Sequence, residues 1–160
     1  MDTIIFYKIG YYSIFIIPIY TTFYIYYTQD IMMLPYYVIC WGFNHIVNTI
    51  IKYIIKQPRP INQLNIIKDD SKYDPYGMPS GHAQHVQYTF SFLFQFADIY
   101  IVTLTCFLTL MAIVQRIDYR KHTINQVFVG CLVGSSIGSC AYLLYENSNK
   151  ILDVNKYEYF

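Results

Sequence analysis

The sequence predicts an all-α integral membrane protein, a helical bundle of about five transmembrane helices in a single domain over residues 1–160. Hydrophobic residues make up 55% of the chain and charged residues only 13%, whereas a soluble domain carries about 25% charge. A soluble fold of this size could not hide so much apolar surface, because small domains bury only about two-thirds of their chain surface. The low charge also excludes a disordered chain, and a net charge of +1 gives no reason to expect a nucleic-acid partner.

Five apolar stretches are candidates for spanning helices, each of which needs roughly 20 residues. They run over about 3–27, 31–56, 80–96, 99–115 and 123–145. The third and fourth stretches are at the short end of this range and predict a tight helical hairpin. The first stretch begins after Asp2, with no basic start and no small-residue cleavage site, so we expect a retained membrane helix there and not a signal peptide.

The polar segments that remain are a long loop over 57–79, a short loop over 116–122 and a tail over 147–160. Since five spans alternate sides of the membrane, both loops are expected on the same side as the N-terminus. Most Lys and Arg residues lie at this side, which the positive-inside rule would make cytoplasmic. The acidic residues of the long loop are interpreted as a solvated charged stretch; they are Asp69, Asp70 and Asp74.

A first polar cluster lies where the second apolar stretch ends. Lys52 is about one turn inside that stretch, and Arg59 stands between Pro58 and Pro60. The two prolines restrict the backbone on both sides and hold the guanidinium in one place. A fixed guanidinium suits bidentate binding of a phosphate group, so Arg59 and Lys52 are candidate phosphate ligands. The structural alternative for Lys52 is a cation that snorkels from a helix end.

A second cluster, Pro79-Ser80-Gly81-His82, opens the third apolar stretch. Ser80 is predicted to be the N-cap, so that the amides of Gly81 and His82 would point out of the helix start and form an anion site. Gly81 would let a ligand approach the backbone closely. His82 would then lie in the first helical turn, next to the bound anion.

A third cluster joins the fourth and fifth stretches. Arg116 ends the fourth stretch and His122 begins the fifth. His122 and Gln126 are four residues apart and share one helix face, so the Gln126 amide could accept a hydrogen bond from the imidazole and fix its tautomer. Taken together, the three clusters bring two imidazoles, three cations and a helix N-terminus to one face of a small bundle. This combination is typical of a site for a phosphoryl group.

In order and spacing, these clusters resemble the three signature motifs of the type 2 phosphatidic acid phosphatase (PAP2) superfamily of membrane lipid phosphatases. The first motif, K-x6-R-P, is matched by Lys52, Arg59 and Pro60. The second, P-S-G-H, is matched by the cluster that ends at His82. The similarity covers a motif-bearing core of about 52–133.

The third motif of the superfamily, S-R-x5-H-x3-D, is matched at Arg116 and His122 but not at its ends. Gln115 stands where the superfamily has Ser, and Gln126 stands where it has Asp. A Gln in the second of these positions, like the Gly-Met-Pro-Ser run and Gln84 after it, is similar to the dolichyl-diphosphatase branch. Gln126 therefore resembles a marker of that branch.

The resemblance implies a PAP2/chloroperoxidase-like helical core, often of six helices, with one N-terminal helix fewer in this chain. It also implies metal-independent hydrolysis of the terminal phosphate of a polyprenyl (dolichyl) diphosphate, with no cofactor. His122 would form a phosphohistidine, His82 would act as general acid and then as general base, and Gln126 would orient His122. The residues implied to hold the phosphoryl oxygens are Lys52, Arg59, Ser80, Gly81 and Arg116.

The expected partners are a polyprenyl or other phospholipid substrate and the lipid bilayer, while the oligomeric state stays open. The resemblance implies the endoplasmic reticulum membrane with a lumenal site, opposite to the side that the positive charges favour. Three alternatives remain: a phosphatase of phosphatidic acid or another lipid phosphate, a non-catalytic lipid-binding protein of the same fold, and a metal site on His82 and His85 near Asp74. A channel or transporter is disfavoured, because the charges gather at one face and not at the bilayer midplane.

Overall fold

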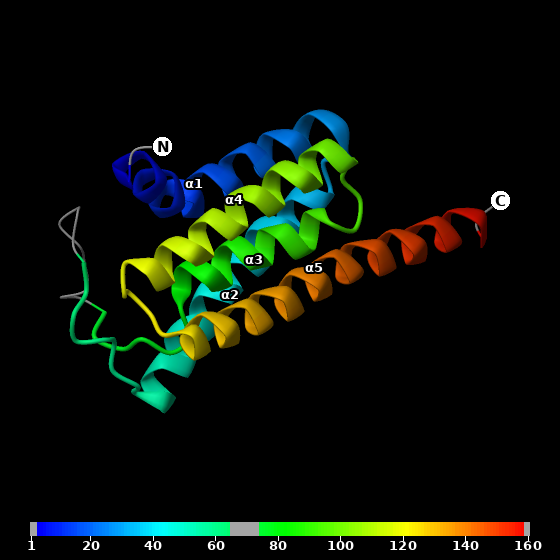
Figure 1. Cartoon of the computed structure of the whole chain (residues 1–160). Coiled ribbons are helices and arrows are strands. Elements are labelled where there is room, and N and C mark those ends of the chain that lie inside the picture. The colour runs from blue at the N-terminus through cyan, green and yellow to red at the C-terminus, as the bar shows by residue number, and fades with distance from the viewer. Residues whose placement is uncertain (1–2, 65–73, 159–160) are drawn as a thin grey trace.

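The computed structural model describes residues 3–64 and 74–158, which form five helices joined by short loops and one longer one. The helices are α1 (Thr3–Thr28), α2 (Met33–Ile55), α3 (Gly81–Leu93), α4 (Ile99–Asp118) and α5 (Ile124–Glu158). Successive helices run in opposite directions, so the N-terminus, the α2–α3 loop and the α4–α5 loop lie at the same end of the bundle (Figure 1). The two polar loops are therefore on the side of the N-terminus, as the alternation of spans predicted.

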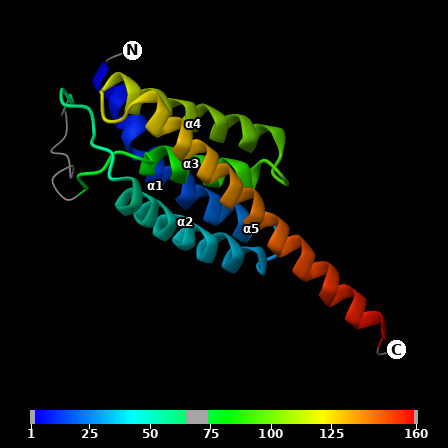
Figure 2. The same cartoon turned by 90° about the horizontal axis from the view of Figure 1, so that it is seen from below.

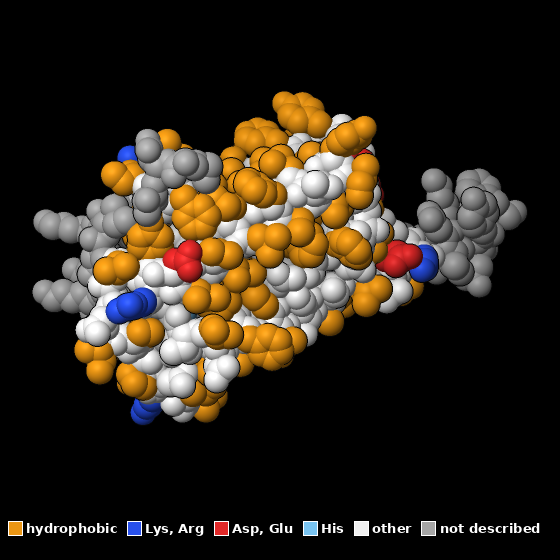
Figure 3. Space-filling view, in the orientation of Figure 1, with side chains coloured by type: hydrophobic (Ala, Val, Ile, Leu, Met, Phe, Trp, Pro, Cys, Tyr) orange, Lys and Arg blue, Asp and Glu red, His pale blue; other side chains and the backbone are white. Residues whose placement is uncertain are grey.

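Four of these helices, α1, α2, α4 and α5, are long and apolar enough to cross a membrane. Large hydrophobic side chains cover the flank of the bundle, and the charged side chains seen in the same view lie toward its two ends (Figure 3). Such a surface is suited to lipid and not to water. The chain is a multi-pass integral membrane protein with the all-helical fold that the composition predicted.

Helix α3 is shorter than the apolar stretch that predicted it, and it occupies the centre of the bundle. Its 13 residues rise by about 20 Å, less than the roughly 30 Å of a hydrocarbon core. It touches each of the other four helices, which the two views of the bundle also show (Figure 2). Because its neighbours surround it, α3 can carry polar side chains such as Gln84, His85 and Thr89 in buried positions.

Three glycines of α5 form the closest helix contact in the bundle. A Cβ on Gly134 would lie 2.2 Å from the carbonyl oxygen of Gln84, and one on Gly138 would lie 2.2 Å from that of Tyr88. Gly130, one turn earlier, faces the start of α3 in the same way. Small residues every four positions let two membrane helices approach backbone to backbone. The spacing therefore fixes α3 against α5 and sets where the first turn of each helix lies.

Buried amides fix α3 against α2 on its other side. The Gln84 side chain donates to the main-chain and side-chain oxygens of Asn44, both at 2.8 Å, and accepts from the Asn48 amide at 2.7 Å. The same Asn48 amide donates to the Pro79 carbonyl at 3.5 Å. Polar side chains in hydrocarbon hydrogen-bond across helices, because no water is present to satisfy them. This network positions the residues that precede α3.

The expected tail from residue 147 is instead a continuation of α5, which runs to Glu158 and extends past the rest of the bundle (Figure 1). No Gly or Pro follows Gly138 to stop the helix.

Helix α4 begins directly after the turn that follows α3, and Asp98 is its N-cap. The Asp98 carboxylate accepts from the amides of Tyr100 and Ile101 at 3.0 and 3.1 Å. The hairpin between α3 and α4 is thus as tight as expected.

Candidate functional site

The three polar clusters meet at the end of the bundle where α2 ends and α3 begins. Helix α2 stops because Lys56 takes a left-handed conformation, with φ of 52°, and Pro58 follows it. The chain on either side of the long loop then pairs in antiparallel fashion: Pro58 bridges Tyr76, and the Gly77 amide donates to the Gln57 carbonyl at 2.7 Å. This pairing brings Arg59 opposite the residues just before Tyr76.

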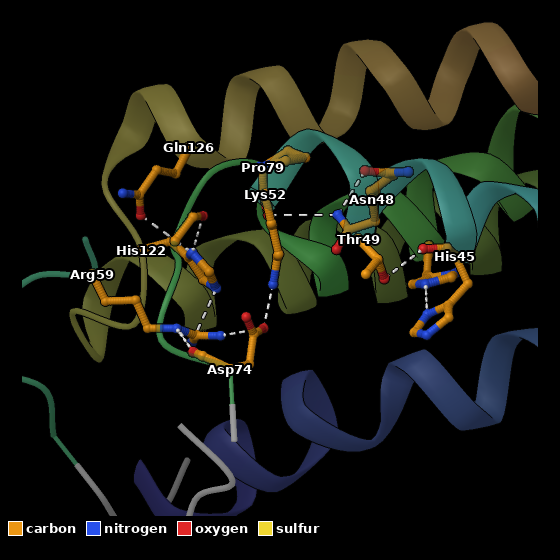
Figure 4. Close-up of polar contacts among 12 residues, drawn as sticks. His45, Asn48, Thr49, Lys52, Arg59, Asp74, Pro79, His122 and Gln126 are labelled. Atoms are coloured by element: carbon orange, nitrogen blue, oxygen red, sulfur yellow. Dashed lines mark hydrogen bonds and ion pairs between the residues drawn. The ribbon is translucent and has the colours of Figure 1, made fainter. Parts of the chain in front are cut away.

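Asp74 occupies the position between the two cations of the first cluster. One carboxylate oxygen is bonded to the Lys52 ammonium and lies 2.8 Å from Nη2 of Arg59 (Figure 4). The Arg59 Nε also donates to the Asp74 main-chain oxygen at 3.0 Å. The interpretation of Asp74 as part of a solvated stretch is therefore wrong, while Asp69 and Asp70 lie outside the described residues. A buried Lys and Arg need an anion, and Asp74 supplies one.

His122 lies beside this ion cluster with one ring nitrogen directed at it. Its Nε2 is 3.4 Å from Nη1 of Arg59, and its Nδ1 is 2.9 Å from the Gly77 carbonyl oxygen and 3.2 Å from Oε1 of Gln126. A carbonyl oxygen only accepts, so Nδ1 carries the proton and the lone pair is on Nε2. Burial and the positive charges of Arg59, Arg116 and Lys52 hold the pKa of His122 well below its usual range, although the bond to Gly77 opposes this.

Gln126 connects His122 to the loop of the first cluster. Its Oε1 faces His122 and accepts from the Thr123 amide at 3.1 Å, and its Nε2 donates to the Pro58 carbonyl at 2.9 Å and to Oε1 of Gln57 at 3.1 Å. The side chain is fully buried. Gly77 must lack a Cβ here, because one would lie 2.6 Å from the Gln126 amide.

Ser80 is the N-cap residue of α3, as predicted, but its side chain makes no capping bond. Its hydroxyl is buried and, among the residues that the structure describes, has no hydrogen-bond partner. Its main-chain amide donates to the Gln126 carbonyl at 2.9 Å. Gly81 follows as the first helical residue, with only Asn48 near the position that a Cβ would take. The hydroxyl of Ser80 is thus available to an incoming group.

His82 and Arg116 lie on the α1 side of the same end. The ring of Tyr11, from α1, is 5.7 Å from the His82 ring and 5.6 Å from the Arg116 guanidinium carbon. Arg116 is 2% exposed, and its carbonyl accepts from the amides of Lys121 and His122 at 3.0 and 3.2 Å. Over the described part of the chain, Nε2 of His82 is buried and makes no hydrogen bond. Tyr11 thus connects the residues of the second and third clusters.

The possible metal site on His82 and His85 can be checked against the described residues. Within residues 3–64 and 74–151, no three His, Cys, Asp or Glu side chains lie close enough together to hold an ion. His85 faces α2, with Asn44 and His45 at its two ring nitrogens, and Asp74 is bonded to cations. The metal site considered on His82, His85 and Asp74 is therefore not formed.

Asp74, the Gly77 carbonyl and Tyr11 were not expected as parts of the site. Their roles depend on the antiparallel pairing around Pro58 and on how α1 packs, and neither has a signal in the sequence.

The comparison with known proteins agrees with the motifs that the sequence does show. The profile of the PAP2 superfamily matches residues 33–150, which include all three motifs.

The chain belongs to the PAP2 superfamily. It is 29% identical over 119 residues to a protein named dolichyldiphosphatase from Saccharomyces cerevisiae, covering 63% of this chain and 47% of that one. It is 28% identical over 117 residues to a protein named chloroplastic lipid phosphate phosphatase epsilon 2 from Arabidopsis thaliana, covering 65% of this chain and 37% of that one. The chain thus spans about half or less of these PAP2 relatives.

A crystal structure of a transmembrane PAP2 type phosphatidylglycerolphosphate phosphatase from Bacillus subtilis has the same fold. The TM-score is 0.58 with 16% sequence identity, over 91% of this chain and 75% of that one. At this identity the match concerns the arrangement of the helices alone. The helical bundle described above is therefore a PAP2 fold.

Proposed function

We propose that this chain is a metal-independent lipid phosphatase that hydrolyses the terminal phosphate of a polyprenyl diphosphate of the dolichyl type. The observation that carries this proposal is the state of His122, whose Nδ1 donates to a main-chain carbonyl while Nε2 points at Arg59, 3.4 Å away. A buried, neutral imidazole with its lone pair next to a guanidinium is suited to attack a phosphorus atom whose oxygens that guanidinium holds.

In the proposed reaction, Nε2 of His122 attacks the terminal phosphorus, and the P–N bond forms as the bond to the leaving oxygen breaks. His82 gives a proton to that oxygen, which leaves as the lipid monophosphate. Water then attacks the phosphohistidine, His82 takes the proton of the water, and orthophosphate is released. The buried Nε2 of His82, which has no partner among the described residues, is consistent with such a proton transfer.

The phosphoryl oxygens would be held by the ring of donors that surrounds this point. Arg59 and Lys52 are held in place together, since the Asp74 carboxylate contacts both. The buried Ser80 hydroxyl and the Gly81 amide would add neutral donors from the start of α3. Arg116 would complete the charge on the α1 side. These groups would stabilise negative charge that grows in the transition state, which is their proposed role in rate.

The substrate class rests on where the site lies and on the relatives. The site is at one end of a bundle whose flank is apolar, so a lipid in the bilayer could present its headgroup there. The yeast relative is named dolichyldiphosphatase. Gln126 in the third motif resembles the same branch of the superfamily. By the same reasoning we place the protein in the endoplasmic reticulum membrane, which microscopy of a tagged chain would test.

A second candidate substrate is phosphatidic acid or another lipid monophosphate. The Arabidopsis relative, named for lipid phosphate phosphatase activity, has similar identity and coverage and supports this reading. The two candidates share the same nucleophile and differ only in the group that leaves.

The test is phosphate release by the detergent-purified protein with a chelator present, using dolichyl diphosphate and phosphatidic acid in parallel. We expect release from the diphosphate, no effect of the chelator, and loss of at least about 1000-fold in kcat for His122→Ala. Full turnover by His122→Ala would contradict the assigned nucleophile. Release from phosphatidic acid alone would replace the substrate, and release from neither would favour a non-catalytic lipid-binding role.

A further inference from the structure

Helix α2 carries a polar stripe of which the proposed reaction uses only Lys52, at its outer end. Its members lie at intervals of three and four residues on one face of an otherwise apolar helix: His45, Asn48, Thr49 and Lys52. From Lys52 to His45 the stripe runs two turns, about 10 Å, deeper into the bundle. Polar side chains at such depth cost free energy and usually mark a path or site for a polar ligand.

The stripe lines a pocket of about 230 Å³ beside the cation site. The other walls come from Tyr53 on α2 and from the residues that precede the second motif, Asp74, Pro75 and Tyr76. This volume is smaller than the roughly 300–1,000 Å³ of pockets for drug-sized ligands, so it fits part of a headgroup and not a whole lipid. Because Lys52 and Asp74 belong to both places, the pocket is continuous with the site of the proposed chemistry.

A chain of hydrogen bonds gives His45 a defined donor. The Gln84 amide donates to Oδ1 of Asn44 at 2.8 Å, so the Asn44 nitrogen is the donor to Nδ1 of His85 at 3.2 Å. Nε2 of His85 therefore carries a proton, which it donates to Nδ1 of His45 at 3.4 Å. The remaining proton of His45 is on Nε2, for which the described residues offer no partner. An exposed imidazole N–H thus lines the pocket.

The protein itself supplies an anion where the two places meet. The Asp74 carboxylate contacts Arg59, which borders His122, and Lys52, which borders the pocket. In Figure 4, Lys52 lies between His122 and Arg59 on one side and His45 on the other. One carboxylate therefore bridges the two cations. A terminal phosphate in its place would contact both, and an inner phosphate linked to it would share Lys52 on the side of the pocket.

We propose that this pocket is the subsite for the second, inner phosphate of a diphosphate lipid, with Lys52 and the Nε2–H of His45 as its donors. The inference rests on the proposed function and specifies its substrate class. The terminal phosphate lies at Arg59 and His122, and the inner phosphate, which leaves, lies on the far side of the phosphorus from the attacking nitrogen. The lipid chain then emerges beside α2, where Ile46 and Ile50 face the bilayer.

The experiment compares farnesyl diphosphate with farnesyl monophosphate, which share the same chain and differ by one phosphate. The variant is His45→Leu in the detergent-solubilised protein. The control is Thr103→Val, which removes an exposed hydroxyl from α4, away from the pocket. We expect the ratio of kcat/KM for diphosphate over monophosphate to fall about tenfold in His45→Leu, as for the loss of one hydrogen bond to a charged group. Thr103→Val should keep the wild-type ratio.

A ratio that stays at the wild-type value in His45→Leu would overturn the subsite, even if both activities fell together. Hydrolysis of neither substrate by the wild type would instead count against the proposed function, and binding then decides the subsite. Inorganic pyrophosphate should raise the melting temperature of the wild type more than orthophosphate does, and His45→Leu should abolish that difference. Equal stabilisation by the two anions in the wild type would refute the subsite without reference to turnover.

Discussion

Asp74 contacts the same two cations, Lys52 and Arg59, that are proposed to hold the substrate phosphate, so removal of its charge should strengthen phosphate binding. The change Asp74→Asn keeps the shape of the side chain. It also keeps the bond from the Arg59 Nε to the main-chain oxygen of residue 74, so the loop should stay in place. A phosphate that arrives at the wild-type site must displace the carboxylate, whereas in the variant it displaces only a neutral amide.

The size of the effect follows from how exposed the ion cluster is. The Asp74 side chain is 41% exposed, while those of Lys52 and Arg59 are 8% and 12% exposed. Exposed ion pairs contribute about 0.2–1 kcal/mol and hydrogen bonds to charged groups about 1.5–3 kcal/mol, so a half-exposed carboxylate on two cations gives about 1–2 kcal/mol in total. This corresponds to a phosphate affinity about 5 to 30 times higher in the variant.

The assay is competitive inhibition by orthophosphate together with its effect on the melting temperature. Without phosphate, Asp74→Asn should be less stable than the wild type, because the buried Lys52 loses its partner; with phosphate, the difference should shrink or reverse. The matched control is Asp118→Asn, which removes the same charge from an exposed position at the same end of the bundle. If orthophosphate binds Asp74→Asn no more tightly than the wild type, Asp74 does not compete for the site and the reasoning fails.

Two further outcomes are expected from the packing and the charges of the site. Gly134→Ala should lower the free energy of unfolding by about 1–3 kcal/mol or more and reduce activity, because its Cβ would lie 2.2 Å from the Gln84 carbonyl oxygen. The control Gly42→Ala should change neither, since nothing lies within 4 Å of that position. Equal melting temperatures for the two variants would contradict the contact. Since the pKa of His122 lies well below its usual 6.5, its neutral form should persist as the pH falls through 6.5. Arg59→Gln removes one of the positive charges that lower this pKa, so the acid limb of kcat/KM should move to higher pH. An acid limb that does not move would refute the electrostatic cause.

The helices were predictable because lipid imposes a simple rule on the sequence. A stretch in hydrocarbon must be apolar and helical, so composition and length locate α1, α2 and α4, and the start of α5, within a few residues. Helix α3 was placed correctly but overestimated in length, because the apolar residues that follow Leu93, such as Phe94, belong to the turn that leads to α4. The end of α5 was missed because polarity was read as the end of a helix, whereas a helix that leaves the bilayer needs no apolar face.

The candidate site was predictable where a motif fixes both residue type and spacing. Lys52, Arg59, His82 and His122 come from separate loops and helix ends, and only the motifs indicated that they meet. Asp74 was misread because its partners are decided by the antiparallel pairing of two loop segments, which leaves no periodic signal. A carboxylate in a polar loop is usually solvated, and only the geometry shows that this one bridges two cations.

The replacement of the superfamily's Asp by Gln126 follows from what the rest of the site requires. In this structure the Gly77 carbonyl already accepts the proton of Nδ1, so the tautomer of His122 does not depend on a charged acceptor. The partner of Nε2 of Gln126 is the Pro58 carbonyl at 2.9 Å, which only a donor can satisfy. A carboxylate at position 126 would face the Pro58 carbonyl with no proton to donate. Its negative charge would also raise the pKa of His122 and so favour the protonated imidazolium, which has no lone pair for attack. A neutral amide here therefore ties the Arg59 loop to α5, and it adds no further negative charge that would compete with the proposed phosphate for Arg59.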